Sequence, residues 1–193
     1  PEAKLGDAKQ LKKGHFAIVM GNPFGIAAEG KPAMSFGIIS ELGRPLTRQL
    51  SPDEERYYGN LIETDARINL GNSGGPLLNI RGEVIGITTA VSTRSGGNEG
   101  VGYAIPMDER TRSIVDQLAR GEIVEYGYLG IRLDRPNPTD RRRAGSPAGL
   151  GALVRQVEDN TPAAKSKLRS GDVIVEFDGS SVQDIDELIR MVG

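Results

Sequence analysis

The stretch Gly71-Asn72-Ser73-Gly74-Gly75-Pro76 is the most informative part of this sequence. A serine hydroxyl is a weak nucleophile unless a base removes its proton and donors stabilise the oxyanion that forms. A glycine two positions before Ser73 allows the backbone to turn so that the N–H groups of Gly71 and Ser73 converge on one point. Gly74 and Gly75 leave room for a substrate and for tight packing behind the serine. The same residue types also favour an ordinary turn, so the stretch alone leaves both interpretations open.

Short strands separated by turn residues surround this stretch on both sides. Apolar runs that are closed by glycine, asparagine or proline predict a strand followed by a turn, and Arg81-Gly82 between two such runs is a hairpin signal. The 26 glycines among 193 residues are about twice the usual share, which also favours turns over helices. Several short strands at this spacing predict an antiparallel barrel or sandwich. The expected strands are residues 16–20, 35–42, 61–64, 76–80, 83–91 and 101–105.

The periodicity changes to that of a helix after the last of these strands. Apolar residues recur at helical spacing from Met107 to Leu118, Asp108 lies near the expected N-cap, and Gly121 occupies the place of a glycine just past a helix end. We therefore expect one terminal helix on an otherwise β domain. Residues 122–126 are expected to form a linker.

The remaining residues predict a smaller α/β module. Thr161-Pro162 is typical of a helix start, with a capping threonine followed by proline in the first turn, and this helix should end before Gly171. A last helix with one apolar face is expected at the end of the sequence. So few elements make a thin sheet, and we expect the last strand of this module to be missing. The apolar face consists of Ile185, Leu188, Ile189 and Val192, and the expected strands are residues 128–133, 152–157 and 172–178.

Composition and charge exclude several classes of function. The sequence has 24 basic and 26 acidic residues and a net charge of −2, without a basic region to hold a phosphate backbone, so nucleic acid is not an expected partner. It has no cysteine, which rules out a disulfide scaffold, a thiol nucleophile and a cysteine-based metal site. The longest apolar run, residues 16–20, is far too short to span a bilayer, so no transmembrane segment is expected.

Two short segments resemble ligand-binding sites, one for phosphate and one for an acidic group, but we expect neither to bind such a ligand. Residues 25–31 have the spacing of a phosphate-binding loop, but Pro32 replaces the Ser or Thr that would bind magnesium. Arg141-Arg142-Arg143 lies in a Pro/Gly-rich stretch, residues 137–149, which we interpret as a solvated loop, with a subunit contact or an acidic ligand as the alternative. His, Asp and Glu residues do not cluster at metal-ligand spacing, so we expect neither a metal nor a cofactor.

Six motifs follow one another in a fixed order between residues 21 and 106. They are GNPFG at 21–25, GIIS at 37–40, TDA at 64–66, GNSGGP at 71–76, GEVIGI at 82–87 and GYAIP at 102–106. The block from Thr64 to Pro76 resembles the nucleophile region of trypsin-fold serine peptidases, with Asn72 where the digestive enzymes of the vertebrate type carry Asp. Taken together, the motifs resemble the HtrA (Deg) family.

This resemblance implies a mostly β fold with two parts. Residues 1–124 would be the second of the two β-barrels of a trypsin-like serine protease domain, followed by its C-terminal helix. Residues 125–193 would be a PDZ domain, a small α/β module that lacks its last strand here. The first β-barrel would precede Pro1 in the longer parent protein.

The resemblance also implies a serine endopeptidase that forms an acyl-enzyme. Ser73 would attack the scissile carbonyl, the amides of Gly71 and Ser73 would hold the oxyanion, and Asn72 would lie between them. The family's catalytic His and Asp lie on the first barrel, upstream of Pro1. We therefore expect the 193-residue chain alone to be inactive, since it carries the nucleophile without its base.

One alternative for the base exists within the chain, because it contains a single histidine, His15. The order His15, then Asp53 or Asp65, then Ser73 is that of chymotrypsin-type enzymes. His15, however, falls at the entry to a strand of the second barrel, a position that the family does not use for catalysis.

Substrate preference is inferred from two places near the nucleophile. Thr88-Thr89-Ala90-Val91 resembles the wall of the primary specificity pocket and contains no acid, so a pocket for Lys or Arg is not expected. The family resemblance implies a preference for a small-to-medium aliphatic residue. Arg67, six residues before Ser73, can lie at the base of the pocket in the trypsin fold, and an acidic preference is the alternative.

In the PDZ-like part, Tyr128-Leu129-Gly130-Ile131 stands in the position of the carboxylate-binding loop. Backbone N–H groups of such a loop bind the C-terminus of a peptide, which adds to the sheet as a strand. Leu188 and Val192 on the last helix would line the pocket for the peptide's final side chain, or they would serve as core packing instead.

The remaining implications concern partners and location. The resemblance implies that the substrates are unfolded or damaged polypeptides and peptide C-termini, that the parent protein is a homotrimer or a multiple of trimers, and that it is periplasmic or otherwise exported. The present chain is expected to be monomeric if trimers form through N-terminal segments. The alternative is a non-catalytic peptide-binding module or a pseudoprotease, whose upstream sequence would lack the His or the Asp.

Overall fold

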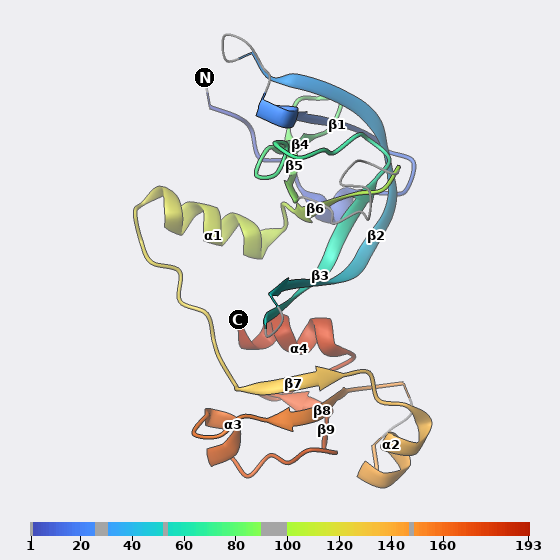
Figure 1. Ribbon diagram of the computed structural model, residues 1–193, viewed down its shortest axis with the longest axis vertical. Helices are drawn as coiled ribbons and strands as arrows, with labels where there is room; N and C mark the ends of the chain where they lie inside the picture. The colour runs from blue at the N-terminus through green and yellow to red at the C-terminus, as the bar shows by residue number, and fades with distance from the viewer. Residues whose placement is uncertain (1, 26–30, 52–53, 90–99, 147–148) are drawn as a thin grey trace. The chain divides into compact units, whose positions relative to one another are not determined.

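The computed structural model describes residues 2–25, 31–51, 54–89, 100–146 and 149–193, with side chains omitted for 47–51 and 54–57 (Figure 1). The chain divides into two compact units, Pro1–Ile123 and Val124–Gly193. The helices in these ranges are too short or too polar to cross a membrane.

The first unit is a closed antiparallel barrel of six strands in the order β1-β2-β3-β6-β5-β4, counted over the described residues. The barrel closes because β1 pairs with β2 on one edge and with β4 on the other. This confirms the mostly β class and the antiparallel barrel expected from the spacing of the strands. The strands are β1 Phe16–Gly21, β2 Ala33–Ser51, β3 Glu54–Thr64, β4 Pro76–Leu78, β5 Val84–Thr89 and β6 Gly102–Pro106.

The barrel core follows from the alternation of side chains along each strand. In β1, Ala17 and Val19 are fully buried while Phe16 is half exposed, as expected of a strand with one inward face. The same alternation places every second residue of β6 inside. The buried cluster consists of Ala17, Val19, Ile39, Ile62, Ala66, Ile68, Leu77, Ile85 and Ala104.

Strands β2 and β3 extend much further than the sequence pattern predicts. The apolar alternation ends at Leu42 and a turn is expected at Gly43, but β2 continues through Gly43 as far as Ser51. Gly43 has a φ of 70° and lies at one of several register shifts in the β2–β3 ladder, so it acts within an irregular strand pair rather than as a turn. Figure 1 shows the two strands as a long curved pair.

The barrel ends in helix α1, Glu109–Ala119, close to the expected range. Asp108 caps it by accepting a hydrogen bond from the N–H of Thr111 at 2.9 Å. Gly121 lies just past the helix end with a φ of 73°, a conformation that favours glycine. Two single turns of 3₁₀ helix, Ala8–Gln10 and Pro23–Gly25, lie before β1 and directly after it.

The second unit contains a three-stranded sheet in the order β7-β8-β9 and a hairpin of β10 and β11. The expected strand over 172–178 is interrupted at Val175 and forms β9 and β10 instead. Helix α4 packs its apolar side into a core around Ala152, Val182 and Leu188. The elements are β7 Ile131–Asp134, α2 Pro138–Ala144, β8 Ala152–Val157, α3 Pro162–Lys165, β9 Val173–Ile174, β10 Glu176–Phe177, β11 Ser180–Ser181 and α4 Ile185–Val192.

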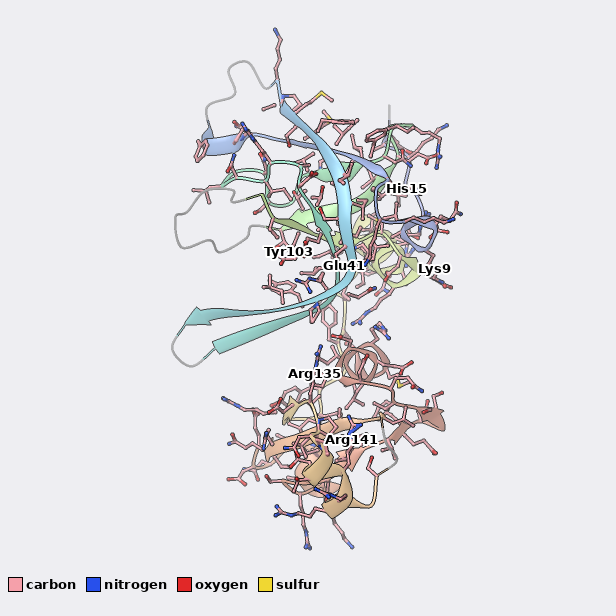
Figure 2. All side chains as sticks on the ribbon, turned by 90° about the vertical axis from the view of Figure 1, so that its right-hand side faces the viewer. Lys9, His15, Glu41, Tyr103, Arg135 and Arg141 are labelled. Carbon is pink, nitrogen blue, oxygen red and sulfur yellow. The ribbon has the colours of Figure 1, made fainter. Side chains whose placement is uncertain are left out.

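The stretch 137–149 corrects one prediction, because it is not a loop throughout. The three arginines 141–143 lie on helix α2, on which Figure 2 labels Arg141. Asn137 accepts hydrogen bonds from the N–H groups of Thr139 and Asp140, and the Asp140 carboxylate accepts one from the N–H of Asn137. This capping box, a proline in the first turn and Gly145 in the left-handed conformation define a short helix that the Pro/Gly content concealed.

Candidate active site

Ser73 lies in the turn between β3 and β4, where its side chain is exposed. The turn packs against the C-terminal end of β1 and against β5. Gly75 lies so close to β1 that a Cβ atom there would be 2.3 Å from the carbonyl oxygen of Met20. The glycine predicted to allow tight packing behind the serine is therefore in a position where only glycine fits.

Gly71 is held against the 3₁₀ turn that follows β1. Its φ is 97°, and a Cβ atom would lie 2.1 Å from the carbonyl oxygen of Asn22. The N–H of Asn22 donates to the carbonyl of Gly71 at 3.3 Å. Two independent reasons, conformation and space, thus require glycine two residues before Ser73.

The peptide unit that carries the Gly71 N–H is fixed through its other end. The carbonyl oxygen of Leu70 accepts a hydrogen bond from the N–H of Phe24 at 2.7 Å. In a trans peptide the C=O and N–H bonds point in opposite directions, so the Gly71 N–H points away from Phe24. Phe24 itself has a φ of 59°, unusual for an aromatic residue, and the sequence motif gave no indication of this role.

The peptide unit that carries the Ser73 N–H is fixed in the same way. The carbonyl oxygen of Asn72 accepts hydrogen bonds from the N–H of Gly75 at 2.9 Å and from the hydroxyl of Thr88. The Ser73 N–H therefore points away from Thr88. Within the described part of the chain, neither the Gly71 nor the Ser73 N–H has an acceptor. Two uncommitted donors beside a serine hydroxyl are what an oxyanion site requires.

The Asn72 side chain points into the protein rather than toward the solvent around Ser73. It is 5% exposed, and its Oδ1 lies against Gly21, where a Cβ atom would be only 2.5 Å away. The Oδ1 atom has no hydrogen-bond partner among the described residues, and the Nδ2 atom reaches the carbonyl of Arg67 only at 3.5 Å. Asn72 therefore contributes to the site through its backbone carbonyl.

The residues predicted to form the specificity pocket differ in their placement. The Arg67 side chain is exposed, and its carbonyl accepts a hydrogen bond from the Ser35 hydroxyl at 2.7 Å. Thr88 is 2% exposed, with its hydroxyl on the nucleophile turn, and Thr89 is half-buried at the end of β5. Ala90 and Val91 lie outside the described residues.

His15, labelled in Figure 2, directly precedes β1 and so lies at the end of this strand opposite to the one that the nucleophile turn contacts. The turn packs on Met20, five residues further along the strand. At about 3.3 Å per residue this separation is about 16 Å, whereas a general base must lie within hydrogen-bond reach, about 3 Å. The structure does not bring His15 to Ser73. Nor do the described His, Asp and Glu residues gather in a group that could hold a metal ion.

In the second unit, Leu129 and Gly130 form a tight loop against helix α3. Gly130 has a φ of 76°, and a Cβ atom there would lie 2.2 Å from Thr161 Cγ2. The carbonyl of Leu129 accepts from the N–H of Ala163 at 3.0 Å, and that of Gly130 accepts from the N–H of Glu158 at 2.9 Å. Among the described residues the N–H groups of Leu129 and Gly130 have no acceptor, so this loop also presents free donors.

Tyr128 and Ile131 flank these donors. The Tyr128 hydroxyl donates to the Glu158 carboxylate, and this hydrogen bond raises the pKa of the tyrosine. Ile131 begins β7, which lies at the edge of its sheet. Glu158 was not found from the sequence, since no motif marks it.

The last helix lies directly beside this loop. A Cβ atom on Gly127 would be 1.7 Å from the carbonyl oxygen of Val192, so the chain before the loop contacts the end of α4. Leu188 is 1% exposed and packs with Ala152 and Val182, and Val192 is half-buried at the margin of the same cluster. Both residues contribute to the core of the unit.

Comparisons with known proteins agree with the two units. Residues 1–87 match the family model for a trypsin-like peptidase domain, and residues 127–193 match that for a PDZ domain. A "periplasmic serine endoprotease DegP-like" protein of Pseudomonas fluorescens is 40% identical over 193 residues, which are 100% of this chain and 38% of that protein. A protein of the same description from Halomonas elongata is 39% identical over 196 residues, 38% of its length.

Solved structures give the same result. The HtrA-type protease AlgW with a tripeptide has a TM-score of 0.78 and 33% identity, and covers all of this chain and 60% of its own. AlgW with a decapeptide has a TM-score of 0.76 at the same identity, over 56% of its chain. The present chain thus spans under half of the two curated relatives described above. The chain joins a trypsin-like peptidase region to a PDZ domain, and over its whole length it is similar to proteases of the HtrA (Deg) type.

Proposed function

We propose that this chain supplies the nucleophile and the oxyanion site of a serine endopeptidase, together with a module that binds peptide C-termini. The observation that carries the first part is the pair of N–H groups on Gly71 and Ser73, which have no acceptor among the described residues. Each belongs to a peptide unit whose carbonyl is held in place by a hydrogen bond, from Phe24 on one side and from Gly75 and Thr88 on the other. Donors fixed before the reaction stabilise developing negative charge without reorganisation.

The reaction assigned to this site is acyl transfer. The Ser73 oxygen attacks the scissile carbonyl carbon while a base takes its proton, and the carbonyl oxygen becomes an oxyanion between the Gly71 and Ser73 N–H groups. The proton then passes to the leaving amine as the peptide bond breaks. Water attacks the acyl-enzyme by the same steps and releases the new C-terminus.

The base and its orienting acid come from outside these 193 residues. His15 is held at the far end of β1, so we assign both roles to a His and an Asp of a first barrel. Loss of the base alone lowers turnover about a million-fold in a serine protease. The 193-residue chain by itself is therefore inactive, and the polypeptide that includes the upstream barrel is the endopeptidase.

The substrate preference assigned to the site is a small-to-medium aliphatic residue. Thr88 and Thr89 carry no charge, and the Thr88 side chain is turned toward the nucleophile turn. Arg67 is the one charge among the described residues of the expected pocket, and its side chain is exposed. A peptide library that returned a strong acidic preference would assign the pocket to Arg67.

The peptide-binding role rests on the loop before β7. The Leu129 and Gly130 N–H groups suit a terminal carboxylate, and β7 offers a sheet edge to which an extended peptide can add. A peptide held there in strand pairing runs beside α4, whose end contacts Gly127. The substrates recruited in this way are unfolded polypeptides with free C-termini. We assign the parent protein to the periplasm, and we propose that it assembles as a trimer or a multiple of trimers.

Reaction with a fluorophosphonate probe, followed by intact mass spectrometry, tests the catalytic role. The polypeptide that includes the upstream barrel should gain one adduct on Ser73, and Ser73→Ala should gain none. Ser180→Ala, which removes an exposed hydroxyl from β11, is the matched control and should react like the wild type. The 193-residue chain alone should not react.

The second candidate function is peptide binding without catalysis, which the position of His15, at the end of β1 far from Ser73, favours for the chain in isolation. Titration with a peptide that has a free carboxylate, and with its C-terminal amide, separates the two. Binding of the acid without turnover by the longer polypeptide would assign the protein to this class.

A further inference from the structure

The Thr88 hydroxyl makes a contact that the acyl-transfer mechanism does not itself require. Thr88 is 2% exposed, and its hydroxyl lies within hydrogen-bond distance of the Asn72 carbonyl and, at 3.0 Å, of the Gly75 carbonyl. We propose that this hydroxyl is a positioning group that keeps the Ser73 N–H turned toward the oxyanion. The proposal rests on the proposed function, since it concerns the same site.

The Thr88 hydroxyl has one proton to donate, and the Asn72 carbonyl is the acceptor that we assign to it. The Gly75 carbonyl already accepts from the backbone N–H of Thr88 at 2.8 Å, whereas among the described residues the Thr88 hydroxyl is the only group of β5 within hydrogen-bond distance of the Asn72 carbonyl. The backbone of Thr88 also accepts from the N–H of Gly74 at 2.8 Å. The main chain of Thr88 therefore holds the far side of the turn, and its side chain holds the peptide unit of the nucleophile.

The orientation of that peptide unit decides whether its N–H group or its carbonyl oxygen faces the oxyanion of the substrate. With the Asn72 carbonyl directed at Thr88, the Ser73 N–H faces the opposite way and can donate to an oxyanion. If the unit rotated, a carbonyl oxygen would face the oxyanion and repel it. Loss of one oxyanion donor lowers kcat by about 10²–10³ in serine proteases, so partial rotation would be visible in turnover.

Among the described residues, the groups that oppose such a rotation are the N–H of Gly75, the hydroxyl of Thr88 and the buried Asn72 side chain, which packs against Gly21. Gly71 and Gly74 flank the unit, with φ values of 97° and 82°, and glycine tolerates alternative backbone conformations on both sides. The remaining hydrogen bond to the Asn72 carbonyl comes from the N–H of Gly75, which belongs to the same turn and can move with it. Thr88, fixed in the barrel ladder opposite Ala104, provides an anchor from outside the turn.

The test compares Thr88→Val, which keeps the shape and removes the hydroxyl, with Thr88→Ser, which keeps the hydroxyl. In the polypeptide with the upstream barrel, Thr88→Val should lower kcat ten- to hundred-fold and leave KM within about twofold. Thr88→Ser should retain kcat within about threefold. Thr64→Val, which removes another buried hydroxyl bonded to a carbonyl of the same barrel, controls for lost stability and should keep kcat. An unchanged kcat in Thr88→Val would overturn the proposal.

A second measurement separates this proposal from the proposed function. In ¹⁵N-edited NMR spectra of the 193-residue chain, the Ser73 amide should give one signal in the wild type and in Thr88→Ser, and a shifted or doubled signal in Thr88→Val. An unaltered Ser73 signal in Thr88→Val would overturn the positioning role, whatever the activity. A wild-type polypeptide that lacks turnover, with the expected change of the Ser73 signal, would contradict the proposed catalysis and leave the positioning role supported.

Discussion

The carbonyl oxygen of Asn22 lies directly beside the Cα atom of Gly71. A Cβ atom on Gly71 would be only 2.1 Å from this oxygen. Real Cβ atoms do not approach an oxygen so closely, and Gly71 also has a φ of 97°. The end of β1 and the nucleophile turn are therefore in direct backbone contact. The position of Ser73 thus depends on Asn22, which lies 51 positions earlier in the sequence.

Gly71→Ala should disturb both the stability and the reactivity of the first unit. The added methyl group forces the turn away from Asn22, and the left-handed backbone adds strain. We expect the free energy of unfolding to fall by about 3 kcal/mol or more, and the reaction of Ser73 with a fluorophosphonate probe to be lost. Urea unfolding of the chain gives the first quantity, and the probe reaction of the longer polypeptide gives the second.

Gly82→Ala is the matched control for this prediction. Gly82 has a φ of 73° in the hairpin between β4 and β5, but a Cβ atom there would meet nothing within 4 Å. The strain of the backbone should lower the free energy of unfolding by about 1 kcal/mol, without loss of the probe reaction. Equal losses in the two variants would show that the contact with Asn22 contributes nothing.

Gly130→Ala should weaken the binding of peptide C-termini. A Cβ atom on Gly130 would lie 2.2 Å from Thr161 Cγ2, so the loop must move away from helix α3 and its N–H groups lose their arrangement. We expect the Kd for a peptide with a free carboxylate to rise at least about tenfold, the size of effect that follows from about 1.4 kcal/mol. Fluorescence titration of a labelled peptide measures it.

Gly179→Ala provides the comparison, because Gly179 has a φ of 73° in open space on the same unit. Its Kd should match that of the wild type. If Gly130→Ala kept the Kd and the circular dichroism spectrum of the wild type, the terminal carboxylate would bind at another place than this loop.

The barrel strands could be predicted because strands that are buried on one face carry short runs rich in apolar residues. In β1, for example, Ala17 and Val19 face inward. The outer half of the β2–β3 pair carries no such run. Its residues are largely polar, and pairing there is carried by backbone hydrogen bonds that any residue except proline can donate. Helix α2 could not be predicted for a different reason. Its capping residues Asn137 and Asp140 lie in a Pro/Gly-rich stretch whose composition is typical of a loop.

The candidate site shows the same division. Ser73 and Gly71 could be found because the chemistry requires a serine after a sharp turn, and only glycine fits that turn. The anchoring roles of Phe24 and Thr88 could not be found, since they depend on which strand ends meet in three dimensions. A backbone N–H and a buried hydroxyl carry no motif of their own.

Leu188→Ala decides between the two roles left open for this residue. Leu188 is 1% exposed and packs with Ala152 and Val182, so truncation leaves a cavity in a small core. We expect a loss of about 2–5 kcal/mol in the free energy of unfolding of the second unit. Ile189→Ala, which truncates the next residue of α4 at 36% exposure, should cost less than about 1 kcal/mol. Chemical unfolding of both variants measures the difference, and similar small losses would indicate a pocket residue instead of a core residue.

The acid stability of the second unit should depend on the ion pair between Asp134 and Arg155, which joins β7 to β8. Arg155 Nε lies 2.9 Å from Asp134 Oδ2, and this hydrogen bond, with a second from the N–H of Arg135, lowers the pKa of Asp134 below its ordinary value of 3.8. A carboxylate whose pKa is lower in the folded state stabilises that state above the unfolded pKa. This contribution is lost as the pH falls below 3.8 toward the folded pKa.

Arg155→Met should therefore raise the pKa of Asp134 and shift the acid-unfolding midpoint of the second unit to higher pH. The carboxyl ¹³C chemical shift of Asp134 during acid titration measures the pKa directly. Both groups are half exposed, so the effect on stability at neutral pH should be small. Arg132→Met is the control, because Arg132 also lies on β7 but forms no ion pair within the described residues. If the two variants titrated alike, β7, the strand to which a peptide would add, would owe its acid stability to backbone pairing with β8 rather than to this ion pair.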